Sequence, residues 1–179
     1  MKKILLTASA IAFACSVQAA EISPYVGVKF GTSRVDVGGE TDKNFVGYLA
    51  GGLKFRDVRG ELEYSYLSQS EYFDGIAKVD MQRLMANIYY DIPYSFENVN
   101  PYVNAGVGNT FYDIDVLGFK DDGNAFTWSV GLGVSIAVLK GWNVDLGYRY
   151  VVTSDFEFYG IKIGDAKTHE GYVGLRYQF

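Results

Sequence analysis

A two-residue alternation between apolar side chains and small or polar ones recurs eight times along this 179-residue sequence. It is clearest over residues 127–138, where every even position is bulky and apolar and every odd position is small or polar. Successive side chains of a β-strand point to opposite faces of its sheet, so the pattern predicts strands with one apolar and one polar face. The other segments lie near residues 25–31, 48–56, 61–66, 83–91, 102–108, 142–149 and 172–179. The sequence therefore predicts an all-β fold.

Two features of these segments favour a transmembrane barrel over a soluble sandwich or a lipocalin-like barrel, which are the alternatives. The polar faces combine glycines with long ionic side chains, which suits a narrow interior better than an open surface. The segments are about ten residues long, the length that a tilted strand needs to cross about 25 Å of hydrocarbon. Since lipid offers no hydrogen bonds, only a closed sheet satisfies every backbone group there.

Short and long connections alternate between the predicted strands. The short ones are residues 56–58, 93–100 and 140–141, and the long hydrophilic ones are residues 34–44, 67–79, 113–125 and 151–167. This order is typical of the periplasmic turns and outer loops of a membrane barrel. We therefore expect an eight-stranded antiparallel up-and-down transmembrane β-barrel with short periplasmic turns and four longer outer loops.

The first twenty residues have the features of a secretory signal peptide. Lys2 and Lys3 precede an apolar run over residues 4–17, which is shorter than the roughly 20 residues of a membrane-spanning helix. Small residues follow, and they allow cleavage after either Ala19 or Ala20. The sequence thus predicts a signal peptide over residues 1–20 and a barrel domain over residues 21–179.

The single cysteine and the net charge exclude other classes of protein. Cys15 lies within the predicted signal peptide, and a lipoprotein is disfavoured because Ala12 and Phe13 do not match the residues that precede an acylated cysteine. The formal net charge is −5 and there is no basic patch, so we expect no nucleic-acid partner.

Charged side chains on the polar faces of the predicted strands are the most definite candidate site. Five are cationic and five are anionic, and buried charges are costly unless they are paired. We therefore predict an ionic network that fills the interior, with a gated pore as the alternative, because an eight-stranded barrel has just enough interior to be filled by side chains. The ten residues are Lys29, Lys54, Glu61, Glu63, Arg83, Asp91, Asp145, Arg149, Glu170 and Arg176.

Four short stretches carry a family likeness: residues 59–64, 87–91, 101–108 and 145–150, which read RGELEY, NIYYD, PYVNAGVG and DLGYRY. Through them the chain resembles the small outer-membrane β-barrel family that includes opacity proteins and the outer-membrane-protein-A and X-type barrels. The resemblance covers essentially the whole mature chain and implies the outer membrane of a Gram-negative bacterium. Tyr177 and Phe179 look like the signal that the barrel-assembly machinery reads. The implied partners are that machinery, outer-membrane lipid and lipopolysaccharide.

The resemblance also bears on catalysis, because lipid A acyltransferases and deacylases share this scaffold and use a histidine with a nearby serine. His169 is the only histidine, and Gly171 stands where a deacylase-like serine would be. We therefore predict no enzymatic activity and no catalytic residues. The acidic segment around Asp113 and Asp121 matches no calcium loop, so we expect neither a metal site nor a cofactor.

The resemblance implies a surface role through the outer loops, either in adhesion and host interaction or as a surface antigen. A passive structural envelope protein that stabilises the outer leaflet and a small porin-like channel are the alternatives. Aromatic residues in the outer segments are candidate contacts to host surface or serum proteins, because interface anchors are often aromatic; otherwise they pack on one another. They are Tyr72, Phe73, Phe111, Phe119, Phe156, Phe158 and Tyr159.

Other outward aromatic residues are expected to form two belts at the membrane surfaces, where aromatic rings lie at headgroup level. The predicted inner belt contains Phe55, Trp142, Tyr177 and Phe179, and the outer belt contains Phe45, Tyr66, Trp128 and Tyr150. The sequence leaves the ligand and the oligomeric state open.

Overall fold

The computed structural model describes the backbone of residues 22–37, 40–72, 77–93, 96–116, 119–158 and 161–179. Side chains are described over residues 22–34, 44–67, 81–93, 96–112, 123–154 and 165–179. Within these ranges no helix is long and apolar enough to cross a membrane.

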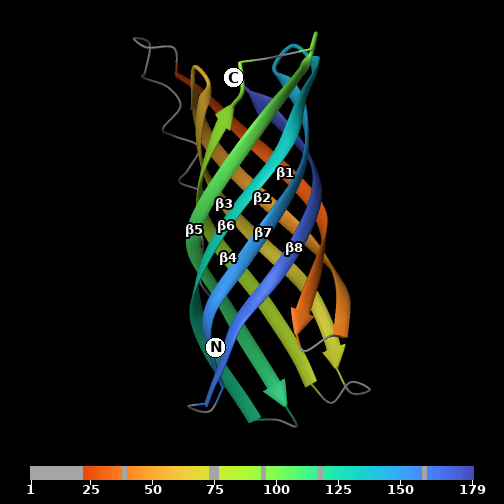
Figure 1. The fold of residues 1–179 in the computed structure, drawn as a ribbon, viewed down its shortest axis with the longest axis vertical. Helices are drawn as coiled ribbons and strands as arrows, with labels where there is room; N and C mark the ends of the chain where they lie inside the picture. Colours follow the sequence, from red (N-terminus) through yellow and green to blue (C-terminus); the bar gives the residue numbers. More distant parts are fainter. Residues whose placement is uncertain (1–21, 38–39, 73–76, 94–95, 117–118, 159–160) are drawn as a thin grey trace.

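Eight antiparallel strands form one closed barrel (Figure 1). Each strand pairs with its neighbours along the chain, and the last strand also pairs with the first, which closes the sheet. The predicted eight-stranded up-and-down barrel is therefore confirmed. The strands are β1 (Ile22–Val37), β2 (Glu40–Phe55), β3 (Val58–Tyr72), β4 (Ala77–Asp91), β5 (Val99–Val116), β6 (Phe119–Leu139), β7 (Trp142–Phe158) and β8 (Ile161–Gln178).

The register of the strands sets their tilt and the width of the barrel. Paired residues followed once around the barrel from Val26 on β1 return to β1 at Asp36, ten residues further along the strand. Such an offset requires the strands to tilt by about 35–45° to the barrel axis. Figure 1 shows this oblique course. A barrel of eight strands has an interior that side chains can fill.

The predicted alternation determines which side chains point outward. Phe30 on β1, Leu49 on β2 and Leu62 on β3 are each more than 60 % exposed, whereas their neighbours along each strand are less exposed or buried. The same apolar exposure continues around all eight strands, including Leu132 and Val173. Apolar surface of this extent is not stable in water, so the outer wall requires an apolar environment.

The hydrophilic segments expected as long outer loops are largely strand. β5 and β6 stay paired as far as Val116 and Phe119, and β1 and β2 stay paired as far as Val37 and Glu40. The alternation of apolar residues ends before this point, but backbone pairing does not require an apolar face once the ladder is established. The outer segments are therefore arms of hairpins, which extend beyond the apolar part of the wall.

The short connections lie at the opposite end of the barrel, together with the chain's C-terminus (Figure 1). Gly141 has a φ of +79°, which favours glycine in the tight turn between β6 and β7. The amide of Gln178 donates to the Gly141 carbonyl over 2.8 Å, and the amide of Phe179 donates to the Pro24 carbonyl over 3.0 Å. These bonds tie the end of β8 to the turn and to the start of β1.

Candidate functional site

The inward faces of the strands bring all ten predicted charged residues into one interior. Nine of them are buried, and the Lys54 side chain is 29 % exposed. An eleventh charged residue, Arg59 on β3, is also buried there. The ion pairs divide these eleven residues into two groups, which we call the inner and the outer ion cluster.

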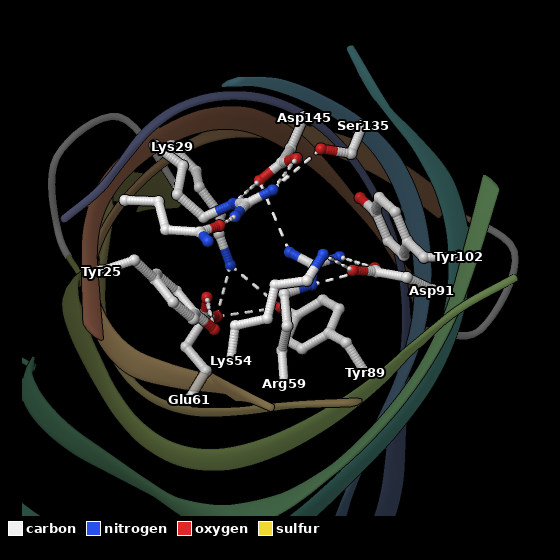
Figure 2. Close-up of polar contacts among 12 residues, drawn as sticks. Tyr25, Lys29, Lys54, Arg59, Glu61, Tyr89, Asp91, Tyr102, Ser135 and Asp145 are labelled. Atoms are coloured by element: carbon white, nitrogen blue, oxygen red, sulfur yellow. Dashed lines mark hydrogen bonds and ion pairs between the residues drawn. The ribbon is translucent and has the colours of Figure 1, made fainter. Parts of the chain in front are cut away.

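The inner ion cluster contains Lys54, Arg59, Asp91, Asp145 and Arg176, and it lies toward the end with the short turns. Figure 2 shows Lys54, Arg59, Asp91 and Asp145 pointing into the interior. Asp91 Oδ2 is 2.6 Å from Lys54 Nζ, and Asp91 Oδ1 is 2.8 Å from Arg59 Nη2. Asp145 Oδ2 is 2.9 Å from Arg176 Nε and 3.8 Å from Arg59 Nη1. Arg59 therefore links the two carboxylates of this cluster.

The outer ion cluster begins at Lys29 on β1. Its Nζ lies 2.6 Å from Glu61 Oε1 and 2.7 Å from Glu63 Oε2, both on β3. Arg149 Nη1 on β7 then approaches the other oxygen of Glu63 to 2.7 Å. Because β7 and β3 are not neighbours in the sheet, this ion pair crosses the interior.

Glu170 on β8 completes the outer ion cluster. Arg149 Nη2 lies 3.1 Å from Glu170 Oε2, and Arg83 Nη2 on β4 lies 2.9 Å from Glu170 Oε1. The Tyr48 hydroxyl donates to Glu170 Oε2 over 3.0 Å. The Glu170 carboxylate is thus held by groups from three different strands.

Tyr89 on β4 connects the two clusters. Its hydroxyl donates to Glu61 over 2.9 Å and accepts from Lys29 Nζ over 3.0 Å, and both partners belong to the outer cluster. The guanidinium of Arg59, which belongs to the inner cluster, lies 4.6 Å from the centre of the Tyr89 ring. Figure 2 shows Tyr89 between these charged groups. Such cation–π contacts add stabilisation where water is excluded.

Inward-facing glycines make room for the interior tyrosines. A Cβ atom at Gly147 would lie 2.3 Å from Cζ of Tyr172, and one at Gly133 would lie 2.5 Å from Cζ of Tyr102. The two tyrosine hydroxyls are 3.0 Å apart. The abundance of glycine and tyrosine in the sequence therefore reflects close packing inside the barrel.

The outer end of the interior is less charged than the middle. Val46 and Leu67 are buried with Tyr48 and Tyr172, and Met81 packs against them. On the opposite wall the hydroxyls of three threonines form a ladder, with 2.7 Å and 3.1 Å between successive oxygens. These threonines are Thr110, Thr127 and Thr153. Apolar and hydroxyl side chains thus cover the ion clusters on the outer side.

Arg59 is the interior charge that the sequence analysis missed. In the sequence Arg59 begins the family-like stretch RGELEY, and the alternation through Glu61 and Glu63 places it on the same face as these two residues. Extending the two-residue period by one step would have found it. With Arg59 included, the interior holds six cations and five anions among the residues described.

The seven outer aromatic candidates are only partly within the described structure. Phe111 is 46 % exposed on the outward face of β5. The backbones of Tyr72, Phe119, Phe156 and Phe158 belong to strands rather than loops, and their side chains are not among those described. Phe73 and Tyr159 lie outside the described residues.

Outward aromatic rings cluster near both ends of the apolar wall. At the inner end, the Tyr177 ring centre is 4.9 Å from that of Trp142 and 5.1 Å from that of Phe179. Toward the outer end, the rings of Trp128 and Tyr150 are 6.3 Å apart in an edge-to-face arrangement. This arrangement is typical of aromatic belts at membrane surfaces.

His169 faces outward on β8, as its position in the alternation predicts. The Tyr148 hydroxyl forms a hydrogen bond with its Nδ1, and the Tyr150 ring lies 5.1 Å from the imidazole. Among the residues that the structure describes, no group of three His, Cys, Asp or Glu side chains could hold a metal ion.

Sequence comparison identifies the class of this barrel. Residues 5–179 match the family model described as the outer membrane protein beta-barrel domain. The chain belongs to this family. The outer membrane barrel is accordingly a multi-pass protein of the Gram-negative outer membrane, and the exposed apolar wall is its lipid-facing surface. The predicted family resemblance and location are confirmed. A comparison with curated proteins found no match.

Solved structures of small outer-membrane barrels share the fold. Neisserial surface protein A aligns with a TM-score of 0.74 and 21 % identity, over 87 % of this chain and 97 % of the other. Ail, the attachment invasion locus protein of Yersinia pestis, aligns with a TM-score of 0.61 and 18 % identity, over 89 % and 99 %. Outer membrane protein H of P. aeruginosa aligns with a TM-score of 0.63 and 18 % identity, over 88 % and 99 %.

Proposed function

We propose that this outer membrane barrel is a surface-interaction protein whose outer hairpins bind host surface or serum proteins. The observation that carries the proposal is the filled interior. Ion pairs such as Arg149–Glu63 and Lys29–Glu63 cross the space that a solute would need. Transport through the barrel is therefore disfavoured, and the outer hairpins are the surface left for a specific task.

The length of the hairpin arms supports this role. β5 and β6 remain paired from Asn109 and Phe126 out to Val116 and Phe119. At about 3.3 Å per residue and a tilt near 40°, these arms extend about 18 Å along the barrel axis. These two arms include the candidate aromatic contacts Phe111 and Phe119, and the outer part of β7 includes Phe156 and Phe158. Aromatic residues presented in this way are suited to anchor a protein partner.

Two structural relatives are consistent with a surface role, although the likeness itself is one of fold. One is described as a surface protein and the other as an attachment invasion locus protein. Because one fold hosts many functions, the proposal depends on the hairpins of this chain rather than on its relatives.

Replacing the outer hairpin ends tests the proposal. Residues 35–42, 68–80, 114–121 and 154–165, which are the hairpin ends, would each be replaced by a two-residue Asn-Gly turn in a non-adherent Gram-negative host strain. These bounds keep the flanking strand pairs in register. We expect cells with the intact protein to bind epithelial cells or serum proteins, and cells with the shortened barrel to lose that binding.

The matched control changes the opposite end of the barrel. Replacing residues 96–98 in the periplasmic connection should leave binding unchanged, since these residues face away from the cell surface. Immunoblots of outer-membrane fractions would show equal amounts of folded barrel. Binding that persists after all four outer segments are shortened would contradict the proposal and favour the structural envelope role.

A further inference from the structure

Among the residues whose side chains the structure describes, outward-facing charged groups on the strands lie at one place only. These residues are Arg34 on β1 and Asp165 and Lys167 on β8, and His169 lies beside them on β8. The other outward strand residues with described side chains are apolar, aromatic, glycine or uncharged polar. β1 and β8 are paired, so these side chains share one patch at the seam where the barrel closes.

The register brings three of the basic side chains together. Arg34 and His169 are direct partners across the β1–β8 ladder, and such partners have Cβ atoms about 5 Å apart. Lys167 precedes His169 by two residues and lies on the same face of β8, about 7 Å away along the strand. All three side chains are exposed, and no residue whose side chain the structure describes forms an ion pair with Arg34 or Lys167.

The patch lies at the outer edge of the lipid-facing wall. Eight residues of β8 separate Tyr177 in the inner aromatic belt from His169, which corresponds to about 20 Å along the barrel axis. His169 is also the register partner of Tyr150 in the outer aromatic belt. Below the patch, Phe30 and Val173 are exposed and apolar. Arg34, Lys167 and His169 therefore lie at the depth of the outer-leaflet headgroups.

We propose that Arg34, Lys167 and His169 bind the phosphate of a phosphorylated glycolipid of the outer leaflet. Arginine and lysine form charge-assisted hydrogen bonds with phosphate oxygens, and arginine does so with two parallel bonds. Since Tyr148 engages Nδ1 of His169, Nε2 is the nitrogen available to the ligand. The acyl chains of the same lipid would lie against Phe30 and Val173.

Charge complementarity favours lipid over a protein as the occupant. The protein as a whole is acidic and no basic patch is evident along its sequence, yet strand pairing brings Arg34, Lys167 and His169 together. The neighbouring acidic residues are Asp165 on β8 and Asp36 on β1, the register partner of Lys167, whereas Lys43 on β2 is the register partner of Arg34. The patch adjoins the lipid-facing wall. At this depth the neighbouring anionic groups are the phosphates of lipid headgroups. The inference does not depend on the proposed surface-interaction function, because the hairpin ends take no part in it.

The test measures lipid binding to protein purified from membranes in detergent. Native mass spectrometry would follow titrations with bis-phosphorylated lipid A, with the same lipid after phosphate removal, and with inorganic phosphate. We expect the phosphorylated lipid to bind at least about tenfold more tightly than the dephosphorylated lipid, since each charge-assisted contact is worth roughly that factor. The double variant Arg34→Ala/Lys167→Ala should weaken binding about a hundredfold, and His169→Ala should weaken it less.

Two control variants separate this site from general effects. Gln82→Ala/Asn109→Ala removes uncharged outward side chains from β4 and β5, and Lys140→Ala removes a positive charge from a periplasmic turn. Neither should change lipid binding, and near-ultraviolet circular dichroism would verify that all variants are folded. Equal binding of the two lipids, or wild-type binding by the double variant, would overturn the proposal. Inorganic phosphate that competes as well as the lipid would overturn the lipid assignment.

Discussion

Arg59 shows how much one interior side chain contributes to this barrel. It lies between the carboxylates of Asp91 and Asp145, and its guanidinium stacks 4.6 Å and 5.0 Å from the ring centres of Tyr89 and Tyr102. Its side chain is 1 % exposed, so water cannot replace it as a partner of the two carboxylates. The residue is thus part of the packing as well as of the charge balance.

The variant Arg59→Leu should therefore be strongly destabilised. Removing one member of a buried ionic network typically costs about 3–5 kcal/mol, because the remaining charges lose their compensation. Chemical unfolding in lipid vesicles would measure the loss. Lys140→Leu in an exposed turn is the control, and surface changes of this kind stay within about 0.5 kcal/mol. Equal stability of the two variants would show that Arg59 is not required for the network.

Residue pattern alone predicts which side chains face inward, but not which of them meet. The alternation identified Glu63, Arg149 and Glu170 as interior residues from the sequence. Which of them pair depends on the ten-residue offset of the closed sheet. This offset shifts the residues of each strand along the barrel axis relative to those of the strand across the interior. That offset arises from tertiary closure, so no local pattern reveals it.

At the scale of the strands, the local sequence pattern also fails to predict how far each strand extends into the hairpin arms. The apolar alternation marks only the part of each strand that crosses lipid, and it ends where both faces meet water. β5 and β6 nevertheless continue to Val116 and Phe119, because an established antiparallel ladder extends through polar sequence. Strand number and order were therefore predictable from the sequence, whereas strand length was not.

The last strand supports a prediction about assembly. Tyr177 lies near the end of β8 and Phe179 directly follows the strand; both belong to the inner aromatic belt, where Tyr177 also contacts Trp142. If the assembly machinery reads these two residues, Tyr177→Ala/Phe179→Ala should sharply reduce folded barrel in outer-membrane fractions. Protein refolded in vitro should lose only the stability of belt contacts, about 0.5–1.5 kcal/mol for each aromatic pair.

Trp142→Ala is the matched control for this prediction. It removes a ring from the same belt but leaves the end of the chain intact, so it should lower stability in vitro without blocking assembly in cells. Cell fractionation and unfolding in vesicles would be measured side by side for the three proteins. Similar assembly defects in both variants would mean that belt packing, rather than a C-terminal signal, determines the yield.

For the whole molecule, the polar and apolar surfaces are reversed relative to a soluble protein. Leu132 and Phe30 face outward into lipid, while Glu170 and Arg149 are 0 % and 1 % exposed in the interior. The ion pairs across the interior join strands that are not neighbours in the sheet, such as β3 and β7. Closure of the barrel and pairing of the charges therefore depend on each other.

Because charged and aromatic side chains fill the interior, the intact barrel should not conduct ions at a stable level in planar bilayers. Tyr48→Ala/Tyr172→Ala would remove two rings that pack beside Arg149 and is expected to introduce small, noisy conductance. The single-channel conductance of a wide porin in the same bilayers serves as the reference for an open channel. A stable open level of similar size in the wild-type protein would contradict the filled interior, and with it the argument that the outer hairpins are the functional surface.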